Sequence, residues 1–95
     1  MKNRARLDCV YRHNPDTASR RIDCEVVILD LKTSVYYSLN ETASTIWETL
    51  GEGLTPRRAV ERLCGEFDKK PADVARDVTE IVEELLRARL IHRVD

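Results

Sequence analysis

The chain has 95 residues, of which 42% are hydrophobic and 35% are charged, and its formal net charge is −1. This length allows one domain with a real core, but not a large catalytic cleft as well. A near-neutral charge creates no overall field that would attract nucleic acid or an anionic membrane. No run approaches the roughly 18 apolar residues of a membrane span, and the N-terminus lacks the apolar stretch of a signal peptide. We expect a single domain over residues 1–95, with residues 1–6 as a flexible tail.

The three cysteines, Cys9, Cys24 and Cys64, are odd in number and widely spaced. This usage favours reduced thiols in a cytoplasmic protein. We expect all three to be small buried hydrophobic residues, with Cys64 on the apolar stripe of a helix.

The first half of the chain predicts three strands. Residues 7–13 form the first strand, and the turn residues Asn14 and Pro15 end it, so residues 14–21 are expected to be a loop. Residues 22–31 contain Val26-Val27-Ile28-Leu29, which is typical of a central strand covered on both faces. Lys32-Thr33 makes a hairpin turn plausible, after which residues 34–39 return antiparallel.

The second half predicts three helices. Asn40 is a good N-cap for a helix over residues 40–50, which Gly51-Glu52-Gly53 stops. Thr55 caps the second helix with Pro56 in its first position, and Pro71 opens the third. The third helix carries a continuous apolar face at Val74, Val78, Ile81, Val82, Leu85 and Leu86. Three strands followed by three helices define an α+β fold.

No catalytic or metal-binding set is visible. His13 and His92 lie at opposite ends among charged residues and are expected on the surface, and no glycine-rich phosphate loop is present. Trp47 falls on the apolar stripe of the first helix and is expected in the core. Tyr37 shares a strand face with Val35 and Leu39 and is expected to point inward, whereas Tyr36 points to the opposite face.

The strand over residues 34–39 would be the edge of a three-stranded meander. Natural edges usually carry Lys, Pro or an inward-pointing charge, and residues 35–39 contain none. The opposite edge, over residues 7–13, carries Asp8, Arg12 and His13. One unguarded edge favours the addition of a strand from a partner. The alternative, that a loop or the basic N-terminal tail covers this edge, stays open.

Residues 26–50, Val-Val-Ile-Leu-Asp-Leu-Lys-Thr-Ser-Val-Tyr-Tyr-Ser-Leu-Asn-Glu-Thr-Ala-Ser-Thr-Ile-Trp-Glu-Thr-Leu, carry a pattern that resembles the PqqD-like family. The Thr-Pro that opens the second helix and the Asp-Val, Leu-Leu and Leu-Ile pairs around the third helix fit the same pattern. These small peptide-binding domains are also called RiPP recognition elements. The likeness covers roughly residues 7–92. The chain has Ser34 where the family often has glycine, and the loop over residues 14–21 is longer than the pattern requires.

The resemblance implies a winged helix-turn-helix-like fold, with a three-stranded antiparallel sheet followed by three helices. It implies that the leader segment of a ribosomally made precursor peptide adds as a strand to the third strand, in a cleft against the third helix. The residues expected to bind peptide are then Val35, Tyr36, Tyr37, Ser38 and Leu39 on the strand, and Val74, Asp77, Val78, Ile81, Glu84 and Leu85 on the helix.

Because the sequence shows no nucleophile–base pair and no cluster of metal ligands, we expect a protein without catalytic activity, metal or cofactor. The resemblance implies that its partner is a maturation enzyme: a radical SAM protein in PQQ biosynthesis, or a leader peptidase and macrocyclase in lasso peptide pathways. No nucleic acid or membrane partner is expected.

A DNA-binding winged-helix regulator is the rival interpretation, and a structural adaptor for another protein is a third. A DNA-recognition helix should be basic. Residues 71–90 instead hold five acidic residues (Asp73, Asp77, Glu80, Glu83, Glu84) against three basic ones (Arg76, Arg87, Arg89). The second helix is more basic, with Arg57, Arg58 and Arg62, so the DNA-binding interpretation stays open. A precursor gene beside a maturation enzyme gene would discriminate between them.

Overall fold

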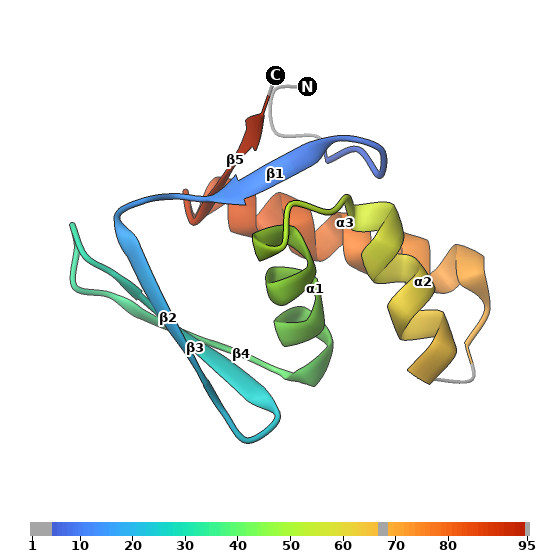
Figure 1. Cartoon of the computed structure of the whole chain (residues 1–95), viewed down its shortest axis with the longest axis horizontal. Coiled ribbons are helices and arrows are strands. Elements are labelled where there is room, and N and C mark those ends of the chain that lie inside the picture. The colour runs from blue at the N-terminus through green and yellow to red at the C-terminus, as the bar shows by residue number, and fades with distance from the viewer. Residues whose placement is uncertain (1–4, 67–68, 95) are drawn as a thin grey trace.

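The computed structural model describes residues 5–66 and 69–94, and its elements follow the order β-β-β-β-α-α-α-β (Figure 1). The α+β class is therefore confirmed, with more strands than the sequence predicted. The elements are β1 (Val10–His13), β2 (Thr17–Ile22), β3 (Glu25–Asp30), β4 (Tyr36–Leu39), α1 (Glu41–Gly51), α2 (Pro56–Glu66), α3 (Pro71–Arg87) and β5 (Ile91–Val94).

The strands form two separate antiparallel sheets, β2–β3–β4 and β1–β5. The expectation that the strand over residues 7–13 lies at the edge of the larger sheet is wrong, because β1 pairs with β5 at the end of the chain, with Tyr11 opposite Arg93. Tyr11, Leu90 and Ile91 are all buried, so this small sheet closes over the core. The pairing of β5 with β1 has no local sequence signal.

The predicted loop over residues 14–21 is also wrong, since β2 occupies most of it and pairs along its whole length with β3. Almost every residue of β2 is exposed. An exposed edge strand does not need alternating apolar residues. Its polar sequence therefore resembles that of a loop. The predicted strand over residues 22–31 is divided by a turn in which Asp23 has φ +57°. Cys24 lies in that turn and is exposed, contrary to expectation, whereas Cys9 and Cys64 are partly buried against the core.

The helix boundaries follow the local signals in the sequence. Asn40 adopts an extended backbone, and its side-chain oxygen accepts from the Ala43 N–H at 2.9 Å. Pro56 and Pro71 begin α2 and α3 as predicted. Within the described residues, no helix is long and apolar enough to cross a membrane.

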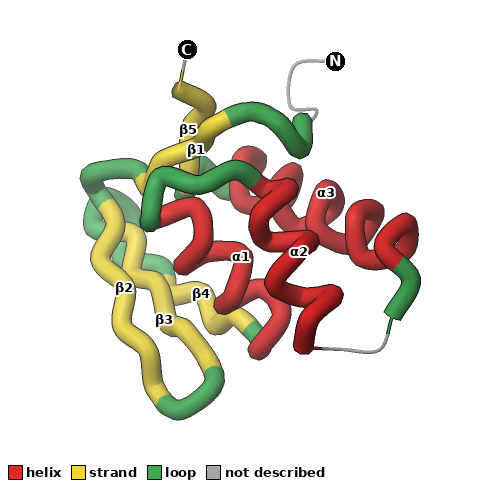
Figure 2. The backbone as a smooth tube through the Cα atoms, turned by 45° about the vertical axis from the view of Figure 1, so that its right-hand side comes forward, coloured by secondary structure: helices red, strands yellow, loops and turns green. Residues whose placement is uncertain are grey.

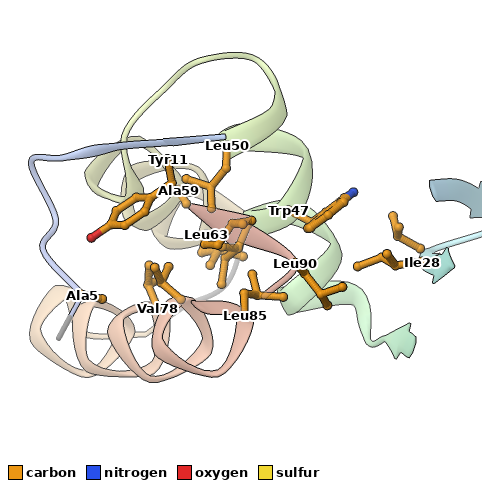
Figure 3. Close-up of a cluster of buried hydrophobic side chains, with 14 of the residues drawn as sticks. Ala5, Tyr11, Ile28, Trp47, Leu50, Ala59, Leu63, Val78, Leu85 and Leu90 are labelled. Atoms are coloured by element: carbon orange, nitrogen blue, oxygen red, sulfur yellow. The ribbon is translucent and has the colours of Figure 1, made fainter. Parts of the chain in front are cut away.

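The core lies between the three helices, the inner face of the larger sheet and the small sheet (Figure 3). Trp47 is 1% exposed, which confirms its predicted place there. The fully or nearly buried apolar side chains also include Tyr11, Val26, Ile28, Ile46, Leu50, Ala59, Leu63, Val74, Val78, Val82, Leu85, Leu90 and Ile91. The helices and the larger sheet together give the winged helix-turn-helix-like arrangement.

All three helices lie on one side of the β2–β3–β4 sheet (Figure 2). On β3, Val26 and Ile28 point inward and are buried, while Val27 and Leu29 point outward and are only partly buried. The central strand is therefore covered on one face rather than on both.

Residues 1–4 of the predicted flexible tail lie outside the described residues. Ala5, which was assigned to that tail, is buried, and its N–H donates to the Glu83 carboxylate at 3.2 Å. The Arg6 N–H donates to the Tyr11 hydroxyl at 3.0 Å. The described part of the predicted tail is thus held against the domain.

Candidate functional site

The outer edge of the larger sheet is β4. The Asp30 N–H donates to the Val35 carbonyl at 2.9 Å, so the backbone groups of Val35 point toward β3. Backbone direction alternates along an antiparallel strand. Tyr37 and Leu39 therefore also face β3, while the N–H and C=O groups of Tyr36 and Ser38 point away from the sheet. Among residues 5–66 and 69–94, no strand pairs with this outward-pointing row.

A buried serine fixes β4 to the first helix. The Ser44 hydroxyl of α1 accepts from the Val26 N–H at 2.8 Å and donates to the Leu39 carbonyl at 3.1 Å. It thus bridges the last register pair of the β3–β4 ladder, Val26 and Leu39. Because Ser44 is fully buried, the edge strand and the helix are held in fixed relation.

The turn before β4 is built on Asp30 and Ser34. The Asp30 carboxylate accepts from the Lys32 N–H at 2.9 Å and the Thr33 N–H at 3.3 Å, and the Ser34 N–H donates to the Asp30 carbonyl at 2.8 Å. Ser34 has φ +62°, a left-handed backbone that glycine adopts more easily. Ser34 therefore adopts this backbone with some strain.

A hollow of about 470 Å³ adjoins the start of β4. Its lining includes Tyr37 of β4, Ala88 and Arg89 just after α3, and residues 14–17. Tyr37 is half-buried and packs against the core, as predicted, while Tyr36 is 68% exposed on the opposite face. The free edge of β4 and the C-terminal end of α3 therefore flank one concave surface.

The six helix residues predicted to bind peptide divide into two groups. Val74, Val78 and Leu85 are 3%, 0% and 4% exposed and belong to the core. Asp77 and Ile81 are partly exposed and Glu84 is exposed. At 100° per residue these three share one margin of α3 with Ala88, which lines the hollow together with Tyr37. Asp77, Ile81 and Glu84 thus form a partly exposed margin of α3 in line with Ala88, while the other three lie in the core.

The arginines of α2 are engaged in ion pairs. Arg57 contacts Asp8 at 2.6 Å and Arg62 contacts Glu52 at 2.9 Å. The hydrogen bonds from these guanidinium groups lower the pKa values of Asp8 and Glu52. Arg58 lies 3.2 Å from Glu61. Because these cations already face carboxylates, α2 is not a free basic surface, and the DNA-binding alternative gains no support.

Sequence reasoning missed a second concave region, between β2 and α1. The His13 ring stacks on Trp47 with centroids 3.5 Å apart, and its Nε2–H donates to the Trp47 carbonyl at 2.8 Å. His13 is half-buried rather than on the surface, and its burial lowers the pKa of the imidazole. A hollow of about 430 Å³ beside this pair is bordered by Arg21 and Glu48, whose side chains form a 2.5 Å ion pair. No spacing in the sequence signals the contact between His13 and Trp47.

No group of three or more potential metal ligands occurs among residues 5–66 and 69–94. The site is instead a length of free strand beside a partly apolar, partly acidic helix margin. Such a surface suits an extended peptide, which gains backbone hydrogen bonds from the edge and side-chain contacts from the hollow. The fold and this edge thus define a small peptide-binding domain of the winged helix-turn-helix-like class.

The chain belongs to the PqqD family: the family model described as coenzyme PQQ synthesis protein D matches residues 25–91. No curated protein sequence matches the chain significantly. Among solved structures, TbiB1 in complex with the TbiA(β) leader peptide is 32% identical with a TM-score of 0.81, covering 85% of this chain and 94% of TbiB1. Lasso peptide synthetase B1 complexed with the leader peptide is 27% identical with a TM-score of 0.80, covering 86% and 96% of the two chains.

Proposed function

We propose that this protein captures the leader of a ribosomally synthesised precursor peptide by β-strand addition to β4. The observation that carries the proposal is the free row of backbone groups at Tyr36 and Ser38 beside the hollow at Tyr37 and Ala88. Two similar structures that are complexes with leader peptides support the same ligand class. An extended peptide matches this edge because it needs no preformed pocket for every side chain.

Antiparallel addition predicts a definite pairing. The leader residues opposite Tyr36 and Ser38 exchange backbone hydrogen bonds with them, and the residue between these two faces Tyr37. Side chains alternate along a strand, so this middle residue points to the inner face, toward the hollow. The leader residues opposite Tyr36 and Ser38 point to the outer face of the sheet.

On the helix, we assign the peptide contacts to Asp77, Ile81 and Glu84. Ile81 offers apolar area at the edge of the core, and the two carboxylates flank it on the same margin. Val74, Val78 and Leu85 support this margin from below, since they are buried against the core. Leu39 contributes to the inner face at the end of β4, and Val35 lies just before the start of the strand.

We further propose that the protein is a non-catalytic, single-domain carrier without metal or cofactor, which presents the leader to a separate maturation enzyme. The described residues offer a binding edge but no cluster of metal-binding side chains, which fits this role. The enzyme would be a radical SAM protein or a leader peptidase and cyclase.

Titration with a leader peptide tests the proposed function. The two probes are the leader of the precursor encoded beside this chain's gene and the TbiA(β) leader. We expect saturable binding of the first, with perturbed amide signals concentrated on residues 35–39 and on α3. Absence of binding by both probes would overturn the proposal.

N-methylation of the leader tests the mode of binding. Methylating the amide opposite Tyr36 or Ser38 removes a donor and inserts a methyl group into the ladder, so affinity should fall at least about tenfold. The amide of the residue opposite Tyr37 points away from β4, so methylating it should leave affinity within about twofold. Equal affinities for all three methylated peptides would exclude strand addition.

A further inference from the structure

The outer face of the β2–β3–β4 sheet is an apolar surface that no described element covers. The register places Ala18, Leu29 and Tyr36 in one row across the three strands, with Val27 in the next row and Ile22 on the same face at the end of β2. Tyr36 is 68% and Ile22 55% exposed. All three helices lie on the other side of this sheet (Figure 2). Exposed apolar patches of this kind on small domains commonly mark interaction sites.

The size of this outer face decides against a stable homodimer. Three strands of four to six residues span on the order of 10–15 Å by 15–20 Å, or roughly 200–300 Å². A stable interface needs about 800 Å² from each partner. A second copy of the chain, docked through this face alone, would bury too little area.

A bound leader would enlarge the outer face. The leader residue opposite Tyr36 points outward and lengthens the row of Ala18, Leu29 and Tyr36. The leader residue opposite Ser38 lengthens the neighbouring row in the same way. The outer face is thus continuous with the leader-binding edge without obstructing it. A protein that receives the same precursor is tethered beside this face by the peptide, and this raises its effective concentration enough for a small contact to suffice.

We propose that the outer face of β2–β3–β4 is the docking surface for the maturation enzyme, and that the bound leader strand completes it. This inference rests on the proposed function. The enzyme surface that fits would present apolar side chains to Leu29 and Tyr36 and an acidic group to Arg20, which is exposed on the same face. Binding of the leader and of the enzyme should then be mutually favourable, by the same factor in each direction.

Charged substitutions on β2, the strand farthest from the leader edge, test this surface. The variants are Ala18→Glu and Ile22→Glu, and the matched control is Ala72→Glu, another exposed alanine that lies in the first turn of α3. The probes are the leader of the neighbouring precursor and the purified maturation enzyme encoded beside it. Leader affinity, enzyme affinity with and without leader, and precursor processing are measured for each variant.

We expect both β2 variants to bind the leader within about twofold of the parent, while enzyme affinity in the presence of leader falls at least about tenfold and processing slows. Ala72→Glu should change neither. Unchanged enzyme affinity in both β2 variants overturns the docking surface while leaving the proposed function intact, whereas a parent that binds no leader overturns the proposed function itself. A parent dimer that Ile22→Glu dissociates would reassign the face to a second copy and also overturn the inference.

Discussion

The two edges of the β2–β3–β4 sheet differ in how they are protected. The free backbone groups of β2 belong to Thr17, Ser19 and Arg21, because the Leu31 N–H bonds the Asp16 carbonyl at 2.8 Å and direction alternates from there. The Thr17 N–H is already bonded to the Asn14 carbonyl at 3.1 Å, and the Arg21 side chain bridges to Glu48. On β4, residues 36–39 carry no charged side chain.

Both edges are tied to α1 through a serine hydroxyl, so anchoring does not distinguish them. Ser44 bridges β3 and β4, and Ser19 accepts from the Trp47 Nε1–H at 3.1 Å. The difference lies in the charged groups and their pairing. Charged side chains on an edge strand discourage pairing with another chain, and Arg21 on β2 is held in an ion pair with Glu48. The comparison teaches that one edge of this sheet is defended while the other is left open for a partner strand.

Proline substitution at matched positions on the two edges should give the largest effect. The Ser38 N–H points away from the sheet, so Ser38→Pro breaks no bond to β3, but it removes a donor and places a ring where the leader would pair. We expect leader affinity to fall at least about 100-fold, or roughly 2.7 kcal/mol. Titration with the leader measures this loss.

Ser19→Pro on β2 is the matched control. Its N–H also points away from the sheet, so the backbone change is the same, although Trp47 loses its hydroxyl partner. Leader affinity should stay within about twofold while stability falls by about 1 kcal/mol. If the two prolines weaken leader binding equally, the open edge is not β4.

Charge reversal on α3 tests the helix side of the same edge. A basic group in the leader would pair with Asp77 or Glu84, which lie seven residues apart on one margin. We expect Asp77→Lys or Glu84→Lys to weaken leader binding by about 1–3 kcal/mol, as at interface hot spots. For exposed Glu84 the change in stability should stay below about 0.5 kcal/mol. Leader titration and urea unfolding separate the two effects.

Glu61→Lys on α2 is the control for these variants. Glu61 is exposed and pairs with Arg58 on α2, away from β4, so leader affinity should be unchanged. Parent-like affinity in Asp77→Lys and Glu84→Lys would remove this helix margin from the site, even if β4 remains the binding edge.

The sequence predicted what is decided locally. Asn40, Pro56 and Pro71 fix helix starts through their own backbone geometry, and Trp47 falls on an apolar stripe that had to face the core. The absence of charged side chains and proline from residues 36–39 could also be predicted, because it depends only on side-chain type.

What the sequence did not predict depends on contacts between distant residues. The pairing of Tyr11 with Arg93 and the stacking of His13 on Trp47 join segments that no local pattern links. On α3, spacing alone could not separate Val78 in the core from Ile81 at its margin, because the width of the buried stripe is set by the elements packed on it. β2 was not predicted because its side chains are almost all exposed and show no apolar alternation.

Replacing the anchoring serine at each edge of the sheet with alanine should have a smaller effect than the substitutions above. Ser44→Ala leaves the buried Val26 N–H and Leu39 C=O without their shared partner, so we expect a loss of about 1–2 kcal/mol in stability and weaker leader binding. Ser19→Ala at the exposed β2 edge should cost less than about 1 kcal/mol, because water can replace the hydroxyl at Trp47. Urea unfolding followed by Trp47 fluorescence measures both. Equal losses would show that burial at β4 adds nothing.

The smallest effect expected is a pH dependence that arises beside the β2 edge. Burial against Trp47 lowers the pKa of His13 below its ordinary value of 6.5, so the unfolded chain binds a proton at a higher pH than the folded protein does. Stability is therefore fully present above about pH 6.5 and declines as the pH falls toward the folded-state pKa. The paired carboxyls of Asp8, Glu48 and Glu52 have lowered pKa values, and their contribution to stability is lost only below the ordinary pKa values of 3.8 to 4.5.

Between pH 7 and pH 5 the urea midpoint should therefore fall in the parent and fall less in His13→Gln, which keeps a donor for the Trp47 carbonyl but does not titrate. Equal slopes in the two proteins would mean that His13 is not the responsible group. Leader affinity should change little over the same range, since His13 lies at the β2 side of α1 and not at the β4 edge.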